Sequence, residues 1–265
     1  MSNTAKGAPQ KAARAGDTIV LIPARLKATR LPGKPLADIL GTPMIVHVWK
    51  RAVAANIGPV VVACEDEEIA DAVRAAGGTA ELTGTQHRSG SDRIFEALTR
   101  IDPGKHYHTI VNVQGDLPNI EPDVIAAVVD PLKNPAVKIG TVVRKLHDGE
   151  LGQSHVVKAH ARFKNGDNVA VATAFTRESE KCMGNCWHHI GIYAYRRASL
   201  ERFVRLKPST NEQKYSLEQL RAMDDGMVMG VRLVETESFG VDTPGDLEKA
   251  RAFLARPPKA AVKAK

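Results

Sequence analysis

The sequence predicts an α/β fold, in which helices cover a doubly wound, mostly parallel sheet. Short apolar runs alternate with helical patterns through the first half of the chain, and this order is typical of right-handed βαβ units. The apolar runs at 18–22, 60–63 and 109–113 are continuous rather than alternating. Strands that are buried on both faces of a parallel sheet have this pattern, so three central strands are expected here.

Helical patterns follow these strands. Residues 65–76 are expected to form a helix that ends at Gly77-Gly78, because glycine favours helix termination. The acidic residues of its first turn are stabilised by the helix dipole. Further helices are expected at about 90–100 and from residue 121 onward, where Glu121-Pro122-Asp123 provides a helix start.

The pattern changes between about residues 136 and 196. Short alternating segments at 137–143, 169–175 and 190–195 indicate antiparallel strands. We interpret this region as an insert of antiparallel strands that enter the main sheet and are available for contact with a second subunit.

After this insert, the chain returns to helices at about 198–206, 214–223 and 244–255, with a strand at 228–234. The sequence contains neither an internal repeat nor a linker that would separate two domains. Residues 17–255 are therefore predicted to form a single domain.

The formal net charge of +7 is carried by the two ends of the chain. Residues 1–16 contain three cations and residues 256–265 contain four, and neither segment contains an acid. Both ends are poor in large apolar residues and are predicted to be disordered tails. The body at 17–255 is formally neutral, which argues against a broad basic face for nucleic acid.

Composition also bounds the location of the protein. No apolar run approaches the ~18 residues that a membrane span requires, and the first tail lacks the apolar centre of a signal peptide. The three cysteines do not resemble a disulfide framework. We therefore expect a cytoplasmic protein that does not contact a membrane.

A basic loop follows the first strand. It carries Arg25, Lys27, Arg30 and Lys34 without any acid, and three prolines restrict its backbone. In open α/β sheets, ligands bind beyond the carboxyl ends of the strands. The loop therefore predicts a site for a strongly anionic ligand, of which a nucleoside triphosphate is the first candidate.

Two carboxylates are candidates for a divalent cation. Asp116 follows an apolar strand and should lie at the rim of the sheet, although a turn aspartate before Pro118 explains it equally well. Near the last helix, Thr243 and Asp246 are explained as a capping box. Asp242 is left without a structural role, so it is a second possible metal ligand.

Two further polar segments are candidate ligand sites. The stretch His87 to Arg93 offers small polar groups at a helix start, which suits a phosphate or a base edge, but plain capping by Ser89 is the favoured interpretation.

The stretch Cys182 to His189 superficially resembles a zinc site. Its spacing matches no common ligand pattern, and His188 and His189 would face opposite sides of a strand, so zinc is not expected there.

Five motifs, in this order along the chain, resemble one enzyme family: I-P-A-R-x(4)-R-L-P-G-K-P-L, V-N-V-Q-G-D, H-I-G-I-Y, E-Q-L-R and G-V-D-T-P-x-D-L. The family is that of the 3-deoxy-manno-octulosonate (Kdo) cytidylyltransferases, and the similarity extends from about Thr18 to Leu254. The resemblance implies a nucleotide-diphospho-sugar transferase fold and a homodimer. It further implies that CTP and Kdo are converted to CMP-Kdo and pyrophosphate for lipopolysaccharide synthesis, with Mg²⁺ as the cofactor.

The same resemblance assigns roles to individual residues. The catalytic residues would be Arg25, Lys34, Asp116 and Asp242, and the metal ligands would be Asp116 and Asp242. The nucleotide would contact Ala24, Arg25, Arg30, Lys34, His87, Ser89, Gln114 and Gly115. The sugar acid would contact Arg177, His189, Tyr193, Glu218 and Gln219.

Three departures from the family pattern concern the acceptor side. Leu117 stands where the family usually has an acid, the region 181–187 is shortened or altered, and Tyr215 replaces a common acid. An 8-amino-Kdo or another sugar acid, such as a sialic-type acid, therefore remains an alternative acceptor. A catalytically silent nucleotide-binding regulator is less favoured, because both Asp116 and Asp242 are present.

Overall fold

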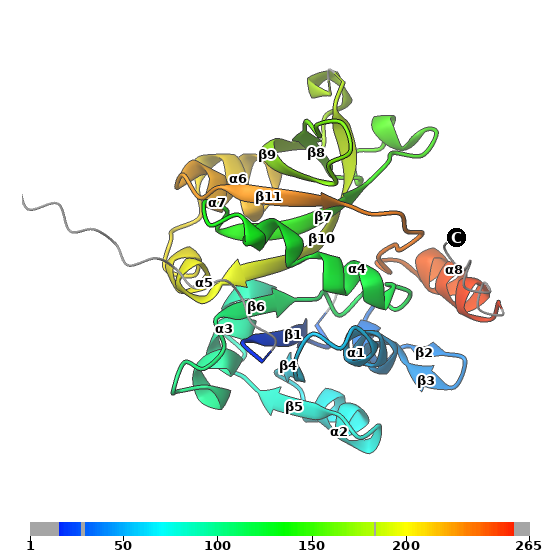
Figure 1. Cartoon of the computed structure of the whole chain (residues 1–265). Coiled ribbons are helices and arrows are strands. Elements are labelled where there is room, and N and C mark those ends of the chain that lie inside the picture. Colours follow the sequence, from blue (N-terminus) through cyan, green and yellow to red (C-terminus); the bar gives the residue numbers. More distant parts are fainter. Residues whose placement is uncertain (1–15, 28–29, 183, 257–265) are drawn as a thin grey trace, which may run out of the picture.

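The computed structural model describes residues 16–27, 30–182 and 184–256. The described residues form a nine-stranded sheet of order β5-β4-β1-β6-β10-β7-β11-β9-β8, with helices on both faces (Figure 1). The predicted disorder of the tails concerns residues that lie almost entirely outside the described ones. Among the described residues, no helix is long and apolar enough to cross a membrane.

The first half of the sheet is parallel, as the sequence predicts. Its strands are β1 (Thr18–Ala24), β4 (Val60–Cys64), β5 (Thr79–Leu82) and β6 (Thr109–Asn112). β1 lies between β4 and β6, and β5 adds to the outer edge of β4. The short strand β5 was not expected from the sequence, because residues 79–82 do not form a continuous apolar run.

Helices connect these strands. They are α1 (Met44–Ala54), α2 (Glu67–Ala75), α3 (Gly90–Ile101) and α4 (Pro122–Ala127). The helix α1 was not expected, although Ile45, Val48 and Ala52 follow the helical spacing and are fully buried. A small separate sheet, β2 (Asp38–Ile39) with β3 (Thr42–Pro43), precedes α1.

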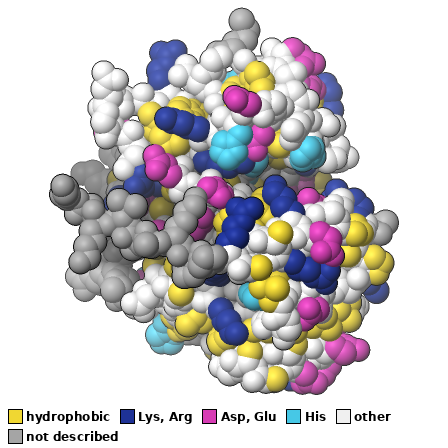
Figure 2. Space-filling view, turned by 90° about the vertical axis from the view of Figure 1, so that its right-hand side faces the viewer, with side chains coloured by type: hydrophobic (Ala, Val, Ile, Leu, Met, Phe, Trp, Pro, Cys, Tyr) yellow, Lys and Arg dark blue, Asp and Glu magenta, His cyan; other side chains and the backbone are white. Residues whose placement is uncertain are grey.

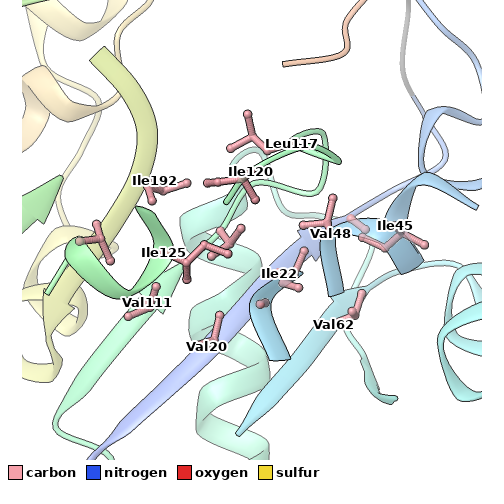
Figure 3. Packing of buried hydrophobic residues seen from close by; sticks show 14 of the residues in the cluster. Val20, Ile22, Ile45, Val48, Val62, Val111, Leu117, Ile120, Ile125 and Ile192 are labelled. Atoms are coloured by element: carbon pink, nitrogen blue, oxygen red, sulfur yellow. The ribbon is translucent and has the colours of Figure 1, made fainter. Parts of the chain in front are cut away.

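The core on one face of the sheet fixes the positions of the strand ends. Figure 3 shows Val20, Ile22, Val62 and Val111 of the sheet together with Ile45 and Val48 of α1 and Ile125 of α4. Each fully buried side chain of this kind stabilises the fold by about 1.5–3 kcal/mol. The opposite face is covered by α3, α5 (Arg197–Phe203) and α7 (Gln219–Asp224), whose apolar residues form a second core with Ile19 and Leu21.

The second half of the sheet is mixed. Its strands are β7 (Ile139–Arg144), β8 (Lys158–Ala161), β9 (Val169–Thr176), β10 (Cys186–Arg196) and β11 (Met229–Leu233). β10 is antiparallel to β6 and β7, and β11 is parallel to β7. β8 pairs with both β9 and β10, which closes these five strands into a ring of pairings.

Residues 136–196 add antiparallel strands to the main sheet, as the sequence predicts. The three predicted strands are β7, β9 and β10, and both β7 and β10 lie in the middle of the sheet. The physical reason is that β10 supplies the hydrogen-bonding edge that β6 leaves open.

The remaining helices are α5 (Arg197–Phe203), α6 (Thr210–Tyr215), α7 (Gln219–Asp224) and α8 (Pro244–Leu254). The single helix predicted at 214–223 is divided into α6 and α7, because Ser216 adopts a left-handed conformation with φ of 52°. Short 3₁₀ turns lie at Lys34–Leu36, Asp130–Lys133, Glu150–Gly152 and Ser179–Lys181.

Candidate active site

A cavity of about 380 Å³ lies beyond the carboxyl ends of β1 and β6. It is lined by every predicted nucleotide residue, namely Ala24, Arg25, Arg30, Lys34, His87, Ser89, Gln114 and Gly115, and by both predicted metal ligands, Asp116 and Asp242. This side of the molecule, at the right in Figure 1, carries Lys and Arg side chains across its middle (Figure 2). The residues that the sequence selected from four separate segments therefore share one cavity.

The loop after β6 approaches β1 closely. A Cβ atom on Gly115 would lie 2.8 Å from the backbone oxygen of Pro23, which is closer than such atoms can approach. Glycine is thus required for the two strand ends to meet, and the next residue, Asp116, reaches the cavity wall. The backbone oxygen of Asp116 accepts a hydrogen bond from Val241 N at 2.9 Å, which holds the segment before α8 beside it.

Lys34 joins the two carboxylates. Its Nζ atom donates to Asp116 Oδ2 at 2.8 Å and to Asp242 Oδ1 at 3.0 Å. Burial lowers the pKa of Lys34, but the charges and hydrogen bonds of the two aspartates outweigh burial, and the pKa is raised overall. Lys34 therefore stays protonated at neutral pH.

The start of α8 explains why Asp242 is available for this contact. Thr243 caps the helix, and Asp246 completes the capping box by accepting from the backbone of Thr243, as the sequence predicts. Asp242 instead accepts from Lys34 and from Arg30 Nη2, which lies 3.0 Å from Asp242 Oδ2.

The two carboxylates fit a hard divalent cation. Both offer an oxygen within 3.0 Å of a single positively charged atom, Lys34 Nζ. Carboxylate oxygens are the protein ligands that Mg²⁺ prefers. Asp116 and Asp242 thus already converge on one cation.

Three further cations of the cavity are unpaired among the described residues: Arg25, Lys27 and Arg88. Lys27 and Arg88 were not selected from the sequence as nucleotide residues, although both lie in segments that the sequence singled out. Arg93 also lines the cavity, but its guanidinium forms a buried ion pair with Glu65 at 2.5 Å. That pair joins residues 28 positions apart, and no local signal predicts it.

His87 and Ser89 are held by the start of α3. The Ser89 side chain accepts from Asp92 N at 3.2 Å, so the predicted cap is present. His87 Nε2 contacts the Glu96 carboxylate; because a carboxylate accepts, Nε2 is the protonated ring nitrogen in this contact. Burial raises the pKa of Glu96, but hydrogen bonds from His87 and Gly84 outweigh this effect, so the pKa is lowered and Glu96 stays charged.

Four of the five predicted sugar-acid residues form a second group, which we call the polar cluster: His189, Tyr193, Glu218 and Gln219. The Tyr193 hydroxyl lies 3.5 Å from Gln219 Oε1, and the rings of His189 and Tyr193 are 5.7 Å apart. Thr141, which sequence reasoning missed, shares a hydrogen bond of 2.9 Å with His189 Nε2. The cluster thus combines residues of β7, β10 and the start of α7.

Burial disfavours charge in the polar cluster. It lowers the pKa of His189 to about 3 and raises the pKa of Tyr193 well above its usual value. Burial also raises the pKa of Glu218, against the opposing effect of a hydrogen bond from Ser89. Because Ser89 lines the cavity, Glu218 places the polar cluster next to the predicted nucleotide residues.

Arg177 is not brought into the polar cluster. Its Nη1 atom donates to the backbone oxygens of Ser154 and His155 at 3.3 and 3.0 Å. Its own backbone oxygen accepts from the buried Lys158 at 3.0 Å. The guanidinium therefore supports the turn before β8.

Two sequence expectations need correction or comment. Leu117 is 6% exposed and packs in the core near Ile120 (Figure 3), so this departure from the family pattern serves packing.

Cys182 and Cys186 are joined in a disulfide, which was not expected. The reason is local: Gly184 and Asn185 both have positive φ angles, and the resulting turn brings the cysteine Cα atoms to 5.8 Å.

Comparison with known proteins identifies the family. Residues 19–230 match the cytidylyltransferase family model. A 3-deoxy-manno-octulosonate cytidylyltransferase of Paramagnetospirillum magneticum is 52% identical over 89% of this chain and 97% of its own length. The chain belongs to the 3-deoxy-manno-octulosonate cytidylyltransferases. Another member of the family, from Parvibaculum lavamentivorans, is 51% identical over 97% of this chain and 99% of its own.

Solved structures place the cytidylyltransferase among related folds. A CMP:2-keto-3-deoxy-manno-octonic acid synthetase complexed with CTP has a TM-score of 0.81 at 36% identity, over 90% of this chain and 98% of that one. A UDP-glucose pyrophosphorylase has a TM-score of 0.63 at 11% identity, covering 89% and 98%, and shares the fold alone. The predicted family and the α/β nucleotidyltransferase fold are therefore confirmed.

Proposed function

We propose that this chain transfers CMP from CTP to the anomeric hydroxyl of Kdo and releases pyrophosphate, with Mg²⁺ as its cofactor. The observation that carries this proposal is the single cavity in which the basic loop meets Asp116 and Asp242 around Lys34. The names of relatives that are about half identical over nearly the whole chain support Kdo as the acceptor.

The cations of the cavity suit a triphosphate. Arg25, Lys27 and Arg88 have no carboxylate partner among the described residues, and they line the same cavity as Lys34. A planar guanidinium can bridge two phosphate oxygens, whereas the Lys34 ammonium acts as a point charge. In this arrangement Arg25 orients the triphosphate and Lys34 neutralises it.

Asp116 and Asp242 would hold the cofactor, since their oxygens already converge on one cation. When bound, Mg²⁺ supplies positive charge at the phosphates and lowers the pKa of a contacted hydroxyl. Arg30, at 3.0 Å from Asp242, orients that carboxylate.

In the proposed reaction, the sugar hydroxyl attacks the α-phosphorus of CTP. The new P–O bond forms as the bond to pyrophosphate breaks, and the hydroxyl proton is released. Charge on the transferring group and on the leaving oxygen increases during this step. Fixed cations such as Arg25 and Lys34 stabilise that charge without reorganising.

The polar cluster would receive the sugar acid. His189, Tyr193 and Gln219 present neutral donors and acceptors, which suit the hydroxyl groups of a sugar. Glu218 connects this cluster to Ser89 at the cavity wall. The guanidinium of Arg177 is engaged elsewhere, so we leave it out of the proposed acceptor site.

The test is release of pyrophosphate from CTP and Mg²⁺ with separate acceptors. Kdo is expected to support turnover, and 8-amino-Kdo and a sialic acid are the comparison acceptors. Faster turnover with either comparison acceptor would replace Kdo in the proposal. Absence of pyrophosphate release with all three would reject the reaction itself.

A homodimer and a cytoplasmic location remain predictions. Val171 on β9 and Leu151 are 45% and 42% exposed, and both lie in the region predicted to contact a second subunit. We propose that this surface forms the dimer contact. Light scattering on the purified protein should give twice the chain mass, and a Val171→Asp variant should shift it toward the monomer.

A further inference from the structure

Three soft ligand groups meet outside the active site. His160 lies on β8, Cys182 follows the turn at Ser179–Lys181, and Cys186 begins β10. His160 Nε2 is 3.3 Å from Cys186 Sγ and 3.8 Å from Cys182 Sγ. All three ligand atoms lie within 4.8 Å of one another, and all three residues are partly buried.

The sheet fixes this arrangement. His160 is directly opposite Cys186 in the antiparallel pairing of β8 with β10, and side chains at such paired positions lie on the same face. The turn at Gly184 and Asn185 then folds Cys182 back toward both. The position of His160 therefore does not depend on whether the two cysteines are oxidised or reduced.

The donor set is that of a zinc site. Zinc binds thiolate sulfur and imidazole nitrogen, and two cysteine ligands separated by two to four residues are common in its sites. The sequence did not predict zinc here, because it offered only His188 and His189 beside the two cysteines, and these contact Glu150 and Thr141 respectively; His160 comes from a separate strand.

We propose that His160, Cys182 and Cys186 form a zinc site that is controlled by the redox state of the two cysteines. In the structure the cysteines form a disulfide. A dithiol reductant transfers two electrons and two protons to this disulfide, which leaves two cysteine thiols and an oxidised, disulfide form of the reductant. Zn²⁺ then displaces the two thiol protons and binds both sulfurs and His160 Nε2.

Space for a fourth ligand lies beside His160. A cavity of about 280 Å³ is lined by His160, Thr173 and Asn185. Three protein ligands with an open fourth position characterise zinc sites that also bind water or a small exogenous ligand. The proposed site therefore takes one water molecule or small thiol in addition to the protein ligands.

The disulfide form and the zinc-bound form would restrain the chain differently. The disulfide joins residues four positions apart in one turn, whereas zinc would also tie this turn to β8 through His160. Lys181, which directly precedes this turn, contacts α6 through Nζ, which donates to the Tyr215 hydroxyl at 3.1 Å. Zinc binding to the reduced protein is expected to raise its melting temperature, as any ligand specific for the folded state does.

The experiment uses untagged, full-length protein that has been reduced and freed of metal. Cobalt(II), which reports its ligands by absorption, is titrated first, and zinc is then added to displace it. We expect one equivalent of cobalt per chain with thiolate-to-cobalt charge-transfer bands, and loss of these bands on addition of zinc. The oxidised protein should bind neither metal until a dithiol is added.

Variants separate this site from other thiols. Cys182→Ser, Cys186→Ser and His160→Ala should each lose the charge-transfer bands or weaken cobalt binding at least tenfold. Cys64→Ser is the matched control, because Cys64 is a buried free cysteine elsewhere, and it should bind as the wild type does. Circular dichroism of each variant verifies that it is folded.

Several results would overturn the proposal. Reduced wild-type protein that binds no cobalt or zinc would do so without any variant, as would equal binding by the oxidised and reduced forms. Retention of the thiolate bands in folded Cys186→Ser, or their loss in Cys64→Ser, would assign them to other sulfurs. Binding of copper(I) with no binding of zinc would reject zinc as the metal.

Discussion

Lys34 donates to the Asp116 carboxylate at 2.8 Å, although 82 residues separate the two in the chain. The contact exists because β1 and β6 are adjacent parallel strands, so the segments that follow them meet at the same edge of the sheet. Lys34 contacts Asp242 as well, at 3.0 Å. An internal cation thus occupies the position toward which both proposed metal ligands point.

This contact predicts competition between Lys34 and the metal. A Lys34→Met variant should bind Mn²⁺, a spectroscopic substitute for Mg²⁺, on the order of tenfold more tightly in the absence of nucleotide, or about 1.4 kcal/mol. Removal of the ammonium leaves the two carboxylates uncompensated, which favours a divalent cation. The same variant should bind CTP more weakly. Electron paramagnetic resonance titration measures the first effect, and the KM for CTP measures the second.

Lys27→Met is the control for this prediction, because Lys27 lines the cavity but contacts neither aspartate. It should leave Mn²⁺ affinity unchanged. Equal Mn²⁺ affinities for wild type and Lys34→Met would contradict competition at this position.

Asp116→Asn should lower kcat by at least 10²-fold, comparable to the loss of one group that stabilises a transition state. The amide keeps the shape of the side chain but removes the charge that Lys34 and the proposed metal share. The rate of pyrophosphate release at limiting Mg²⁺ measures this effect. Asp148→Asn is a matched control on an exposed residue without a contact partner among the described residues. Full turnover of Asp116→Asn at limiting Mg²⁺ would remove Asp116 from the catalytic group.

The sequence predicted those parts of the site that depend on strand ends. Lys34 and Asp116 follow parallel strands, so the rule for parallel sheets was sufficient to place them together. Asp242 was selected because helix capping left it without a structural role, and only the family resemblance joined it to Asp116. Side-chain contacts between different elements left no such signal: the contacts of His87 with Glu96 and of Thr141 with His189 depend on how whole elements pack. Leu117 illustrates the same limit, because only burial in the core distinguishes it from a site residue.

The fold shows a corresponding division. The parallel strands β1, β4 and β6 were predicted because continuous apolar runs mark strands buried on both faces. The helix α1 was missed although its apolar spacing is regular, since its N-cap residue Pro43 makes no side-chain cap hydrogen bond. The entry of β10 into the main sheet was predicted, but its neighbours β6 and β7 were not, because alternation predicts an antiparallel strand and does not identify the strand it pairs with.

Gly115→Ala should destabilise the protein by about 1–3 kcal/mol, the usual cost of forcing an extra carbon into a packed position. The added Cβ would lie 2.8 Å from the Pro23 backbone oxygen, and backbone cannot move aside as a flexible side chain can. Because Asp116 is the next residue, its displacement should also raise the KM for CTP. Urea unfolding and steady-state kinetics measure the two effects.

Gly152→Ala is the matched control, since a Cβ there meets no atom within 4 Å. It should change the unfolding free energy by less than about 0.5 kcal/mol. An unchanged urea midpoint and KM for Gly115→Ala would show that the segments around Gly115 and Pro23 can move apart without loss of stability or of CTP binding.

Glu218→Gln should stabilise the protein at neutral pH but not at acidic pH. Burial raises the pKa of Glu218 in the folded state above its usual value of 4.5. Below pH 4.5 the Glu218 carboxyl is protonated in both the folded and the unfolded state, so the carboxyl and the amide differ little in their effect on stability. As the pH rises from 4.5 through the raised pKa, the unfolded chain loses the proton first, and the wild type alone loses stability.

The difference in unfolding free energy between Glu218→Gln and wild type should therefore grow across this pH interval and then level off. Urea unfolding at pH 4 and pH 8 measures it. Glu235→Gln is the control, because Glu235 is exposed and has no contact partner among the described residues; its effect should be the same at both pH values. A stabilisation by Glu218→Gln that is equal at pH 4 and pH 8 would mean that the amide improves packing. In that case the Glu218 carboxylate would carry no burial penalty.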